Sequence, residues 1–199
     1  MIILHGNLAK IEGCMQTGKL RIISGKYRGR KIQVPNAEEV RPTTDRVRET
    51  VFNWLQNDLH NAVCLDAFAG SGVLGFEALS RGAASVCFVE KQKRVFEVLR
   101  VNAKLLGADN VTLINNSFEK VPLKNCPVFD VVFFDPPFYR QLIRSSFQTL
   151  LKSNRLAENA LIYVECEASL LDEMELEQTK LLKQKIAGEV GYSLYRLVR

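Results

Sequence analysis

The sequence lacks the segments that mark secreted and membrane proteins. No apolar run approaches the roughly 20 residues that a transmembrane helix needs, and the first residues lack the basic and then apolar pattern of a secretory signal. The five cysteines are scattered, none in a C-x-x-C spacing, and three lie in or beside apolar runs. We therefore expect unpaired, buried thiols in a cytoplasmic protein, with no membrane association and no metal site.

The composition that remains is that of a globular protein with an uneven charge. The 199 residues are 47% hydrophobic and 25% charged, enough for one domain with a good-sized core and an appendage. Residues 1–48 carry a net charge of +6, and residues 49–199 carry −1. A basic segment on a near-neutral domain is typical of a protein that binds a phosphate backbone, although a solvated surface rich in Lys and Arg has the same charge.

Apolar patterning predicts three parts. Residues 1–19 show no clear period and are expected to be a poorly ordered leader. Residues 20–58 predict a basic extension, with two short strands around a turn at Gly25 and then a helix. Thr43 or Thr44 is expected to cap this helix. Its apolar stripe is Val47, Val51, Trp54 and Leu55.

Strands and helices are expected to alternate through the third part, residues 59–199. This alternation, with almost wholly apolar strands, predicts an α/β fold: a Rossmann-like, mostly parallel sheet with helices on both faces and an antiparallel hairpin at one edge. Strands are expected near 63–67, 85–90, 110–114, 128–134, 160–165, 179–186 and 190–198, and helices near 73–81, 92–106, 139–152 and, in an acidic stretch, 168–177.

A glycine-rich turn follows the first strand of that sheet. The spacing Gly70-x-Gly72-x-x-Gly75 leads into a helix, and Glu90 stands 20 residues past Gly70 at the end of the second strand. Such glycines let the backbone approach a ligand beyond the carboxyl ends of the strands, where a carboxylate can accept ribose hydroxyl protons. The spacing fits both nicotinamide cofactors and S-adenosylmethionine. Asp66, directly before the turn, would repel a pyrophosphate and favours the positively charged sulfonium cofactor.

The tetrapeptide Asp135-Pro136-Pro137-Phe138 follows the apolar strand 128–134. Its two prolines remove N–H donors and hold the loop extended, so that nearby carbonyls can act as acceptors, and Asp135 supplies a second acceptor. Two acceptors beside the flat ring of Phe138 suit an amino group on a planar ring. Accepting both hydrogens aims the nitrogen lone pair at an electrophilic methyl group. The motif predicts an amino-group methyltransferase; the structural alternative is a stiffened loop with a chance Asp.

Together these motifs resemble those of class I amino-methyltransferases. The blocks Arg21-Ile-Ile-Ser-Gly-Lys-Tyr-Arg-Gly-Arg-Lys31 and Arg41-Pro-Thr-Thr-Asp-Arg46 are similar to the RsmD family of small-subunit ribosomal RNA guanine-N2 methyltransferases, over roughly residues 20–198. The resemblance implies methyl transfer from S-adenosylmethionine to N2 of one guanine in 16S ribosomal RNA, on an assembling 30S particle.

The same resemblance implies roles for individual residues. Asp66, Gly70 and Gly72 would hold the methionine portion of the cofactor and Glu90 its ribose, with Phe68 also in the cofactor site and Asn116-Ser117 in the place beside the adenine. The catalytic group is expected to be Asp135, Pro136, Pro137 and Phe138. Our candidates for RNA phosphate contacts are Arg21, Lys26, Arg28, Arg30 and Lys31.

Several alternatives stay open at this point. The block 41–49 either closes over the cofactor or supplies helix-cap and surface groups. The acceptor could be adenine N6, cytosine N4 or a protein glutamine, and the surplus proton could leave to Asp135 or to solvent. Rivals of other classes are a non-catalytic RNA-binding assembly factor and, more distantly, a nicotinamide oxidoreductase. His5 and His60 lie far from the motifs in sequence and are expected to be incidental.

Overall fold

A seven-stranded mixed sheet forms the centre of the computed structural model, which describes residues 18–35, 45–137 and 142–198. The strand order is β5-β4-β3-β6-β7-β9-β8, and the neighbouring pairs from β5 through β7 are parallel. β9 pairs antiparallel with both β7 and β8, so the expected antiparallel hairpin at one edge is confirmed. The strands are β3 Val63–Asp66, β4 Ser85–Val89, β5 Val111–Ile114, β6 Phe129–Phe134, β7 Leu156–Glu167, β8 Thr179–Ala187 and β9 Val190–Leu197.

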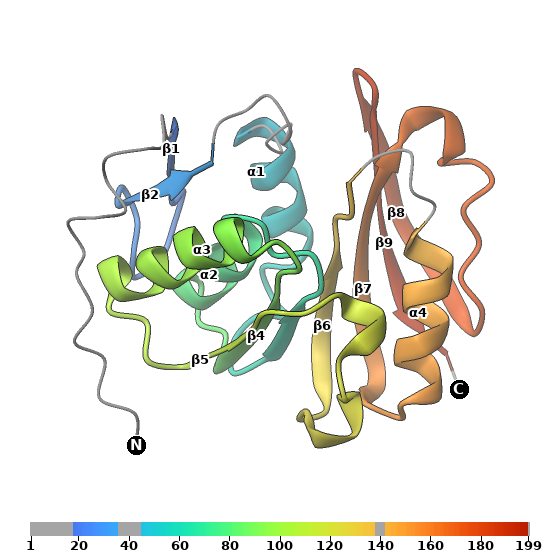
Figure 1. Cartoon of the computed structure of the whole chain (residues 1–199). Helices are drawn as coiled ribbons and strands as arrows, with labels where there is room; N and C mark the ends of the chain where they lie inside the picture. The colour runs from blue at the N-terminus through green and yellow to red at the C-terminus, as the bar shows by residue number, and fades with distance from the viewer. Residues whose placement is uncertain (1–17, 36–44, 138–141, 199) are drawn as a thin grey trace.

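Helices cover both faces of this sheet (Figure 1). One face carries α1 (Asp45–Trp54), α2 (Val73–Ser80) and α3 (Lys93–Leu106), whose buried side chains join one hydrophobic cluster. The other face carries α4 (Leu142–Lys152), which packs into a second cluster. The longest of these helices, α3, ends at Gly107, whose φ of 62° supplies the left-handed cap that a helix end favours.

The first part of the basic extension, before α1, packs onto the face that carries α1, α2 and α3. β1 (Gly18–Arg21) and β2 (Lys31–Val34) form a separate antiparallel pair. β1 begins two residues before the expected start, and residues 22–30 between the strands make a longer connection than a single turn at Gly25. Ile22, Tyr27 and Ile32 are buried in the same cluster as α1, α2 and α3. The extension therefore shares its core with the sheet. Residues 1–17 and the expected caps Thr43 and Thr44 lie outside the described residues.

The acidic stretch 168–177 is not the helix that its sequence predicted. Within it, the structure has a single 3-10 turn, η4 (Ala168–Leu170). The stretch is held against β9 instead: the hydroxyl of Tyr195 donates to the carbonyl of Met174 at 2.9 Å, and Leu171 packs against Gly191, where an added Cβ would lie 3.0 Å from it. Contacts with a distant strand thus override the local helical pattern.

The cysteines in apolar runs are small buried residues, as expected. Cys64, Cys87 and Cys166 are buried and unpaired. The part of the chain that the structure describes contains no helix long and apolar enough to cross a membrane.

Candidate active site

The glycine turn and the proline motif lie side by side at the carboxyl edge of the parallel strands. Asp66, the last residue of β3, is the register partner of Phe133 in β6, and the N–H of Ala67 donates to the carbonyl of Phe133 at 3.1 Å. Asp135 follows Phe133 by two residues. Two motifs separated by more than sixty residues of sequence therefore meet at one edge of the sheet.

The turn has the backbone shape that its glycines permit. Gly70 and Gly72 have φ values of +54° and +86°, in the left-handed region. A side chain at Gly72 would come within 2.5 Å of Leu99 and Phe76, whereas one at Gly70 would meet nothing within 4 Å. Gly72 is thus required by packing inside the fold. The open space beside Gly70 lets a ligand come close to the backbone.

Asp66 is buried beneath this turn, with 1% of its surface exposed. Its Oδ2 accepts the N–H of Gly75 at 3.1 Å, which braces the first turn of α2. Burial raises the pKa of this carboxyl to about 7, and the charge of Glu90 adds to the rise, while the N–H groups of Gly75 and Phe68 oppose it. Asp66 therefore supports the turn and changes its charge near neutral pH.

Glu90 follows β4 on the other side of the turn. Its Oε2 accepts the N–H of Gly70 at 2.9 Å and its Oε1 accepts the N–H of Gln92 at 2.6 Å. Burial raises the pKa of this carboxyl as well, against the N–H groups that lower it. A carboxylate accepts about four hydrogen bonds, so capacity remains for ribose hydroxyls. Two carboxylates beside one turn suit a positively charged nucleoside cofactor better than a pyrophosphate.

The loop after β5 completes this side of the site. The N–H of Ser117 donates to Oδ1 of Asn116 at 2.9 Å, and both residues are half-buried. The sequence reading passed over Asn115, whose Nδ2 donates to the carbonyls of Glu90 at 2.8 Å and Lys91 at 3.2 Å. Its position at the carboxyl end of a strand was the signal that could have found it.

Phe68 packs as an apolar member of the turn. Its ring lies 6.1 Å from that of Phe118 and 6.3 Å from that of Phe134, between centroids. It is half-buried, so its ring supports the turn from below while part of it stays accessible.

In the proline motif, Asp135 is half-buried, Pro136 buried and Pro137 exposed; Phe138 lies outside the described residues. The hydroxyl of the buried Tyr163 donates to Oε2 of Glu165 at 2.8 Å. Burial raises the pKa of Tyr163 well above its usual value, and the negative charges of Glu165 and then Asp135 raise it further. Tyr163 and Glu165 thus stand behind Asp135. Sequence reasoning gave them no role, although an acid ending the apolar run 160–165 was a signal.

A buried carboxylate holds the basic extension to the site. Glu77 of α2 is fully buried and accepts the N–H groups of Ile23 at 2.8 Å and Ser24 at 3.1 Å. It also pairs with Arg81 at 2.8 Å and, more distantly, with Arg48 at 3.9 Å. Arg48 is itself buried and pairs with Asp45 at 2.5 Å, so this residue is an internal anchor of α1. Asp45, Arg46 and Glu49 of the same block are exposed, as expected for surface groups, and residues 41–44 lie outside the described residues.

Asn102 of α3 links the extension directly to the glycine turn. Its Nδ2 donates to the carbonyls of Gln33 at 2.8 Å and Ser71 at 2.9 Å, and its Oδ1 accepts the N–H of Gln33 at 2.8 Å. The side chain is fully buried. One amide therefore fixes β2 and the turn relative to each other.

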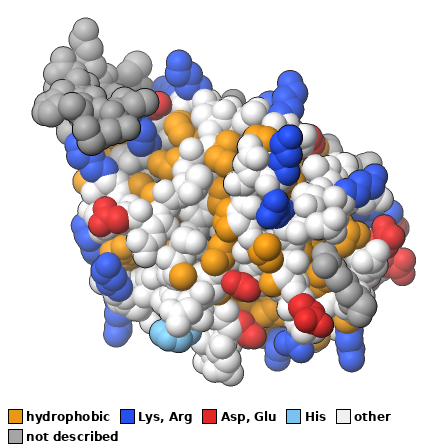
Figure 2. Space-filling view, turned by 90° about the horizontal axis from the view of Figure 1, so that it is seen from below, with side chains coloured by type: hydrophobic (Ala, Val, Ile, Leu, Met, Phe, Trp, Pro, Cys, Tyr) orange, Lys and Arg blue, Asp and Glu red, His pale blue; other side chains and the backbone are white. Residues whose placement is uncertain are grey.

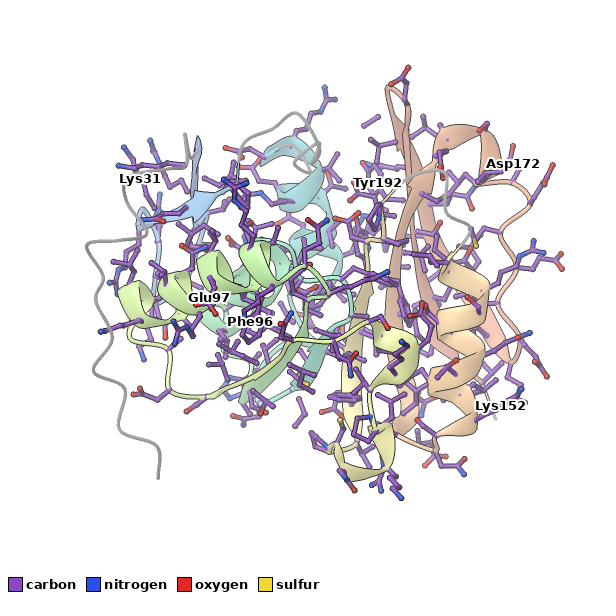
Figure 3. All side chains as sticks on the ribbon, in the orientation of Figure 1. Lys31, Phe96, Glu97, Lys152, Asp172 and Tyr192 are labelled. Atoms are coloured by element: carbon purple, nitrogen blue, oxygen red, sulfur yellow. The ribbon has the colours of Figure 1, made fainter. Side chains whose placement is uncertain are left out.

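The five cations expected to contact RNA phosphates are all exposed: Arg21, Lys26, Arg28, Arg30 and Lys31. Arg30 is also tied to the end of α3, donating from Nη1 to the carbonyl of Leu106 at 2.8 Å and from Nη2 to that of Leu105. Lys31, labelled in Figure 3, lies on the side of α1 away from β9. The structure gathers these residues on one docked segment.

A separate hollow of about 310 Å³ lies at the opposite, amino edge of the strands, the face seen in Figure 2. It is far from the glycine turn and is lined mainly by polar groups, among them Asp58, His60, Asp130 and Glu158. No group of three or more metal-ligating side chains occurs among the residues that the structure describes. None of the residues of the glycine turn or the proline motif lines this hollow, so it is separate from the site at the carboxyl edge.

Comparison with known proteins identifies relatives along nearly the whole chain. Residues 20–196 match the family model described as conserved hypothetical protein 95. Ribosomal RNA small subunit methyltransferase D of Haemophilus influenzae is 47% identical over 194 residues, covering 95% of this chain and 100% of that protein. The protein of the same name from Escherichia coli K12 is 44% identical, covering 90% and 91%. The solved structure of Escherichia coli yhhF has a TM-score of 0.80 at 40% identity, covering 91% and 99%.

Proposed function

This chain belongs to the ribosomal RNA small subunit methyltransferase D family, and we propose that it transfers the methyl group of S-adenosylmethionine to the exocyclic N2 of a guanine in 16S ribosomal RNA. The target proposed for the family is guanine 966. The observation that supports this chemistry best is the meeting of the glycine turn with Asp135-Pro136-Pro137 at one edge of the sheet.

The residues around the turn fit the cofactor. The open space beside Gly70 admits a ligand, Glu90 would accept its ribose hydroxyls, and Asp66 would offset its positive charge. Bound S-adenosylmethionine would supply an electrophilic methyl group.

The proline motif would hold the acceptor. Asp135 and the carbonyl of Pro136 would each accept one hydrogen of the guanine amino group, with Phe138 stacked on the base. This directs the nitrogen lone pair toward the methyl carbon for direct in-line transfer. The new C–N bond would form as the S–C bond breaks, and the surplus proton would leave to Asp135 or to solvent. Positioning and fixed dipoles would account for the acceleration.

The substrate would be held mainly through its phosphates. The exposed cations of the extension would contact the RNA backbone without reading its sequence. The guanine would have to leave its stack to reach the proline motif, at a cost of a few kcal/mol. We propose the assembling 30S particle as the physiological substrate.

The acceptor is tested by transferring a labelled methyl group to unmethylated small-subunit RNA and resolving the digested nucleosides. We expect label in N2-methylguanosine. Asp135→Ala should lower the transfer rate roughly a hundredfold or more, because one acceptor of the amino group is removed. Its affinity for S-adenosylmethionine, measured by calorimetry, should stay close to that of the unaltered chain.

The other readings predict different results. Label in N6-methyladenosine, N4-methylcytidine or protein glutamine would keep the chemistry and overturn the acceptor. RNA binding without label in any acceptor would favour an assembly factor. Binding of NAD in place of S-adenosylmethionine would favour an oxidoreductase.

A further inference from the structure

The β8–β9 hairpin at the edge of the sheet has four of its cationic side chains on one face. Paired residues of neighbouring strands share a face, and successive residues of a strand alternate between the two faces. In β9, Tyr192 and Leu194 point toward α1 and join its hydrophobic cluster, while Tyr195 and Leu197 join the cluster of α4. The ring of Tyr192 stacks on Trp54 of α1, with 5.4 Å between centroids.

Four cations lie on the α1 side. Lys183 and Lys185 pair with Leu194 and Tyr192 of β9. Lys180 pairs with Arg196, which lies two residues after Leu194 and therefore on the same face of β9. All four of these side chains are exposed. None of them forms an ion pair with another residue of the described ranges. We call this surface, made of Lys180, Lys183, Lys185 and Arg196, the hairpin cation face.

Four acidic residues of the same region lie on the other side of the hairpin. The segment between β7 and β8 contains Asp172, Glu173, Glu175 and Glu177, all exposed. It packs with α4, because Leu171 and Leu176 belong to that cluster and Asp172 Oδ1 accepts the amide of Gln184 at 3.2 Å. Figure 3 shows Asp172 on the side of the hairpin away from α1. These four carboxylates are thus kept apart from the cations. On the α1 side, where Glu165 and Glu167 pair with Tyr192 and Val190, the four exposed cations outnumber these two carboxylates.

Lys185, at one end of the hairpin cation face, is level with the proline motif across the sheet, whereas Lys180 and Arg196 at the other end are level with Leu161, toward the amino edge. Lys185 pairs with Tyr192, and Tyr192 pairs with Glu165. Glu165 follows Val164, the partner of Phe134, just as Asp135 follows Phe134. Three strand spacings separate β6 from β8, a distance of about 14 Å. The basic extension lies beyond α1 on the other side (Figure 1), so cations flank the site on two sides.

We propose that the hairpin cation face binds phosphates of the RNA strand next to the target guanine, as a second anchor separate from the N-terminal extension. This rests on the proposed function, since it presupposes an RNA substrate. Exposed, unpaired lysines gain binding energy by releasing counterions from phosphates. Two anchors on opposite sides of the proline motif would hold the strand at both flanks while one base is turned out between them.

The experiment measures binding of the full chain to unmethylated 30S particles at several salt concentrations. For the double variant Lys183→Gln/Lys185→Gln we expect roughly tenfold weaker binding. We also expect the slope of log affinity against log salt to be shallower by about 1.4, as for two lost single-strand phosphate contacts. Affinity for S-adenosylmethionine should not change. Lys183→Arg/Lys185→Arg keeps the charges and should bind as the unaltered chain does.

A matched control removes two charges elsewhere. Lys124 and Lys152 are exposed, and Lys152, labelled in Figure 3, lies at the end of α4 near the amino edge of the sheet. Lys124→Gln/Lys152→Gln should leave RNA binding nearly unchanged. Equal weakening in both Gln pairs would reduce the effect to net charge and overturn the proposal, as would unaltered binding in the hairpin variant. If the unaltered chain methylates guanine but the hairpin variant binds normally, the second anchor is wrong and the proposed function stands. If the unaltered chain neither binds nor methylates the particles, both proposals are wrong.

Discussion

Asp66 and Glu90 illustrate how single residues can serve both the fold and the chemistry. Each accepts a backbone N–H at the glycine turn, Asp66 from Gly75 and Glu90 from Gly70. Each is also partly or fully withdrawn from water, which raises its pKa. Such groups favour a positively charged ligand, because its charge offsets the cost of ionising a buried carboxylate.

This arrangement predicts that cofactor affinity depends on pH. The pKa of Asp66 is about 7 in the free protein, so the group is partly protonated at neutral pH and mostly protonated below it. A cationic cofactor favours the ionised form, so binding releases a proton and the affinity should rise with pH, by up to about tenfold per unit, until it levels above about pH 7. Calorimetric titration with S-adenosylmethionine between about pH 5.5 and 8.5 measures this.

Asp66→Asn is the control for that titration. It keeps the size of the side chain and should bind more weakly with a much flatter profile, any remaining slope belonging to Glu90. An affinity of the unaltered chain that does not change with pH, or an equal slope in the Asn variant, would remove Asp66 from the cofactor site.

Glu77 is the residue on which attachment of the extension depends. Glu77→Gln removes the buried charge that faces Arg81 at 2.8 Å and Arg48 at 3.9 Å, while Arg48 keeps Asp45 at 2.5 Å. We expect a loss of about 3 kcal/mol of unfolding free energy, the lower end of the cost of breaking a buried ion pair. Glu97→Gln is the matched control, because Glu97 pairs with Arg100 on the surface of α3, where a pair contributes about 0.5 kcal/mol or less. Urea unfolding compares the two. Equal, small losses would contradict the anchoring role.

At the scale of elements, apolar patterning located the strands and helices of the sheet within a few residues, β7 reaching furthest beyond its expected bounds. Buried parallel strands must be apolar on both faces, and the turns between them need glycines, so both leave a local signal. The helix predicted for 168–177 was wrong because Leu171 and Met174 have helical spacing but contact Gly191 and Tyr195 of β9 instead. Asn102 and Glu77 were not predicted because each holds a backbone group 31 or more residues away in the sequence. Tyr163 was not predicted because its role depends on its burial, which the sequence does not show.

The turn at Gly25 was predicted from sequence, but the reason for its glycine is tertiary. Its φ is +79°, and an added Cβ would lie 1.7 Å from the carbonyl oxygen of Ser80 in α2. Gly29 has nearly the same φ, +80°, with nothing within 4 Å. Two glycines of one segment thus share the left-handed backbone conformation and differ in what an added side chain would contact.

Alanine substitutions separate these two effects. Gly29→Ala should cost about 1–2 kcal/mol, the penalty of a left-handed residue. Gly25→Ala should cost roughly 3 kcal/mol or more, because the loop must leave α2 and lose the bonds from Lys26 and Tyr27 to Ser80. It should also weaken RNA binding while S-adenosylmethionine still binds. Equal losses in both variants, measured by urea unfolding, would show that the close approach to Ser80 contributes nothing.

At the scale of the whole molecule, the fold brings three parts to one edge. The turn after β3 and the motif after β6 meet there because their strands are neighbours in the sheet. The extension packs beside them through Glu77, Ser80 and Asn102, and shares one buried cluster with α1, α2 and α3. The proposed sites of methyl transfer and RNA binding would thereby belong to one packed unit, with cations on both sides of the proline motif.

The most direct test of this account is methylation of 30S particles that lack the modification, with labelled S-adenosylmethionine and primer extension to map the modified position. We expect one methyl group per particle, on the guanine proposed as the family's target, 966. With Asp135→Ala we expect almost none. Label at a different nucleotide, or an Asp135→Ala variant as active as the unaltered chain, would contradict it.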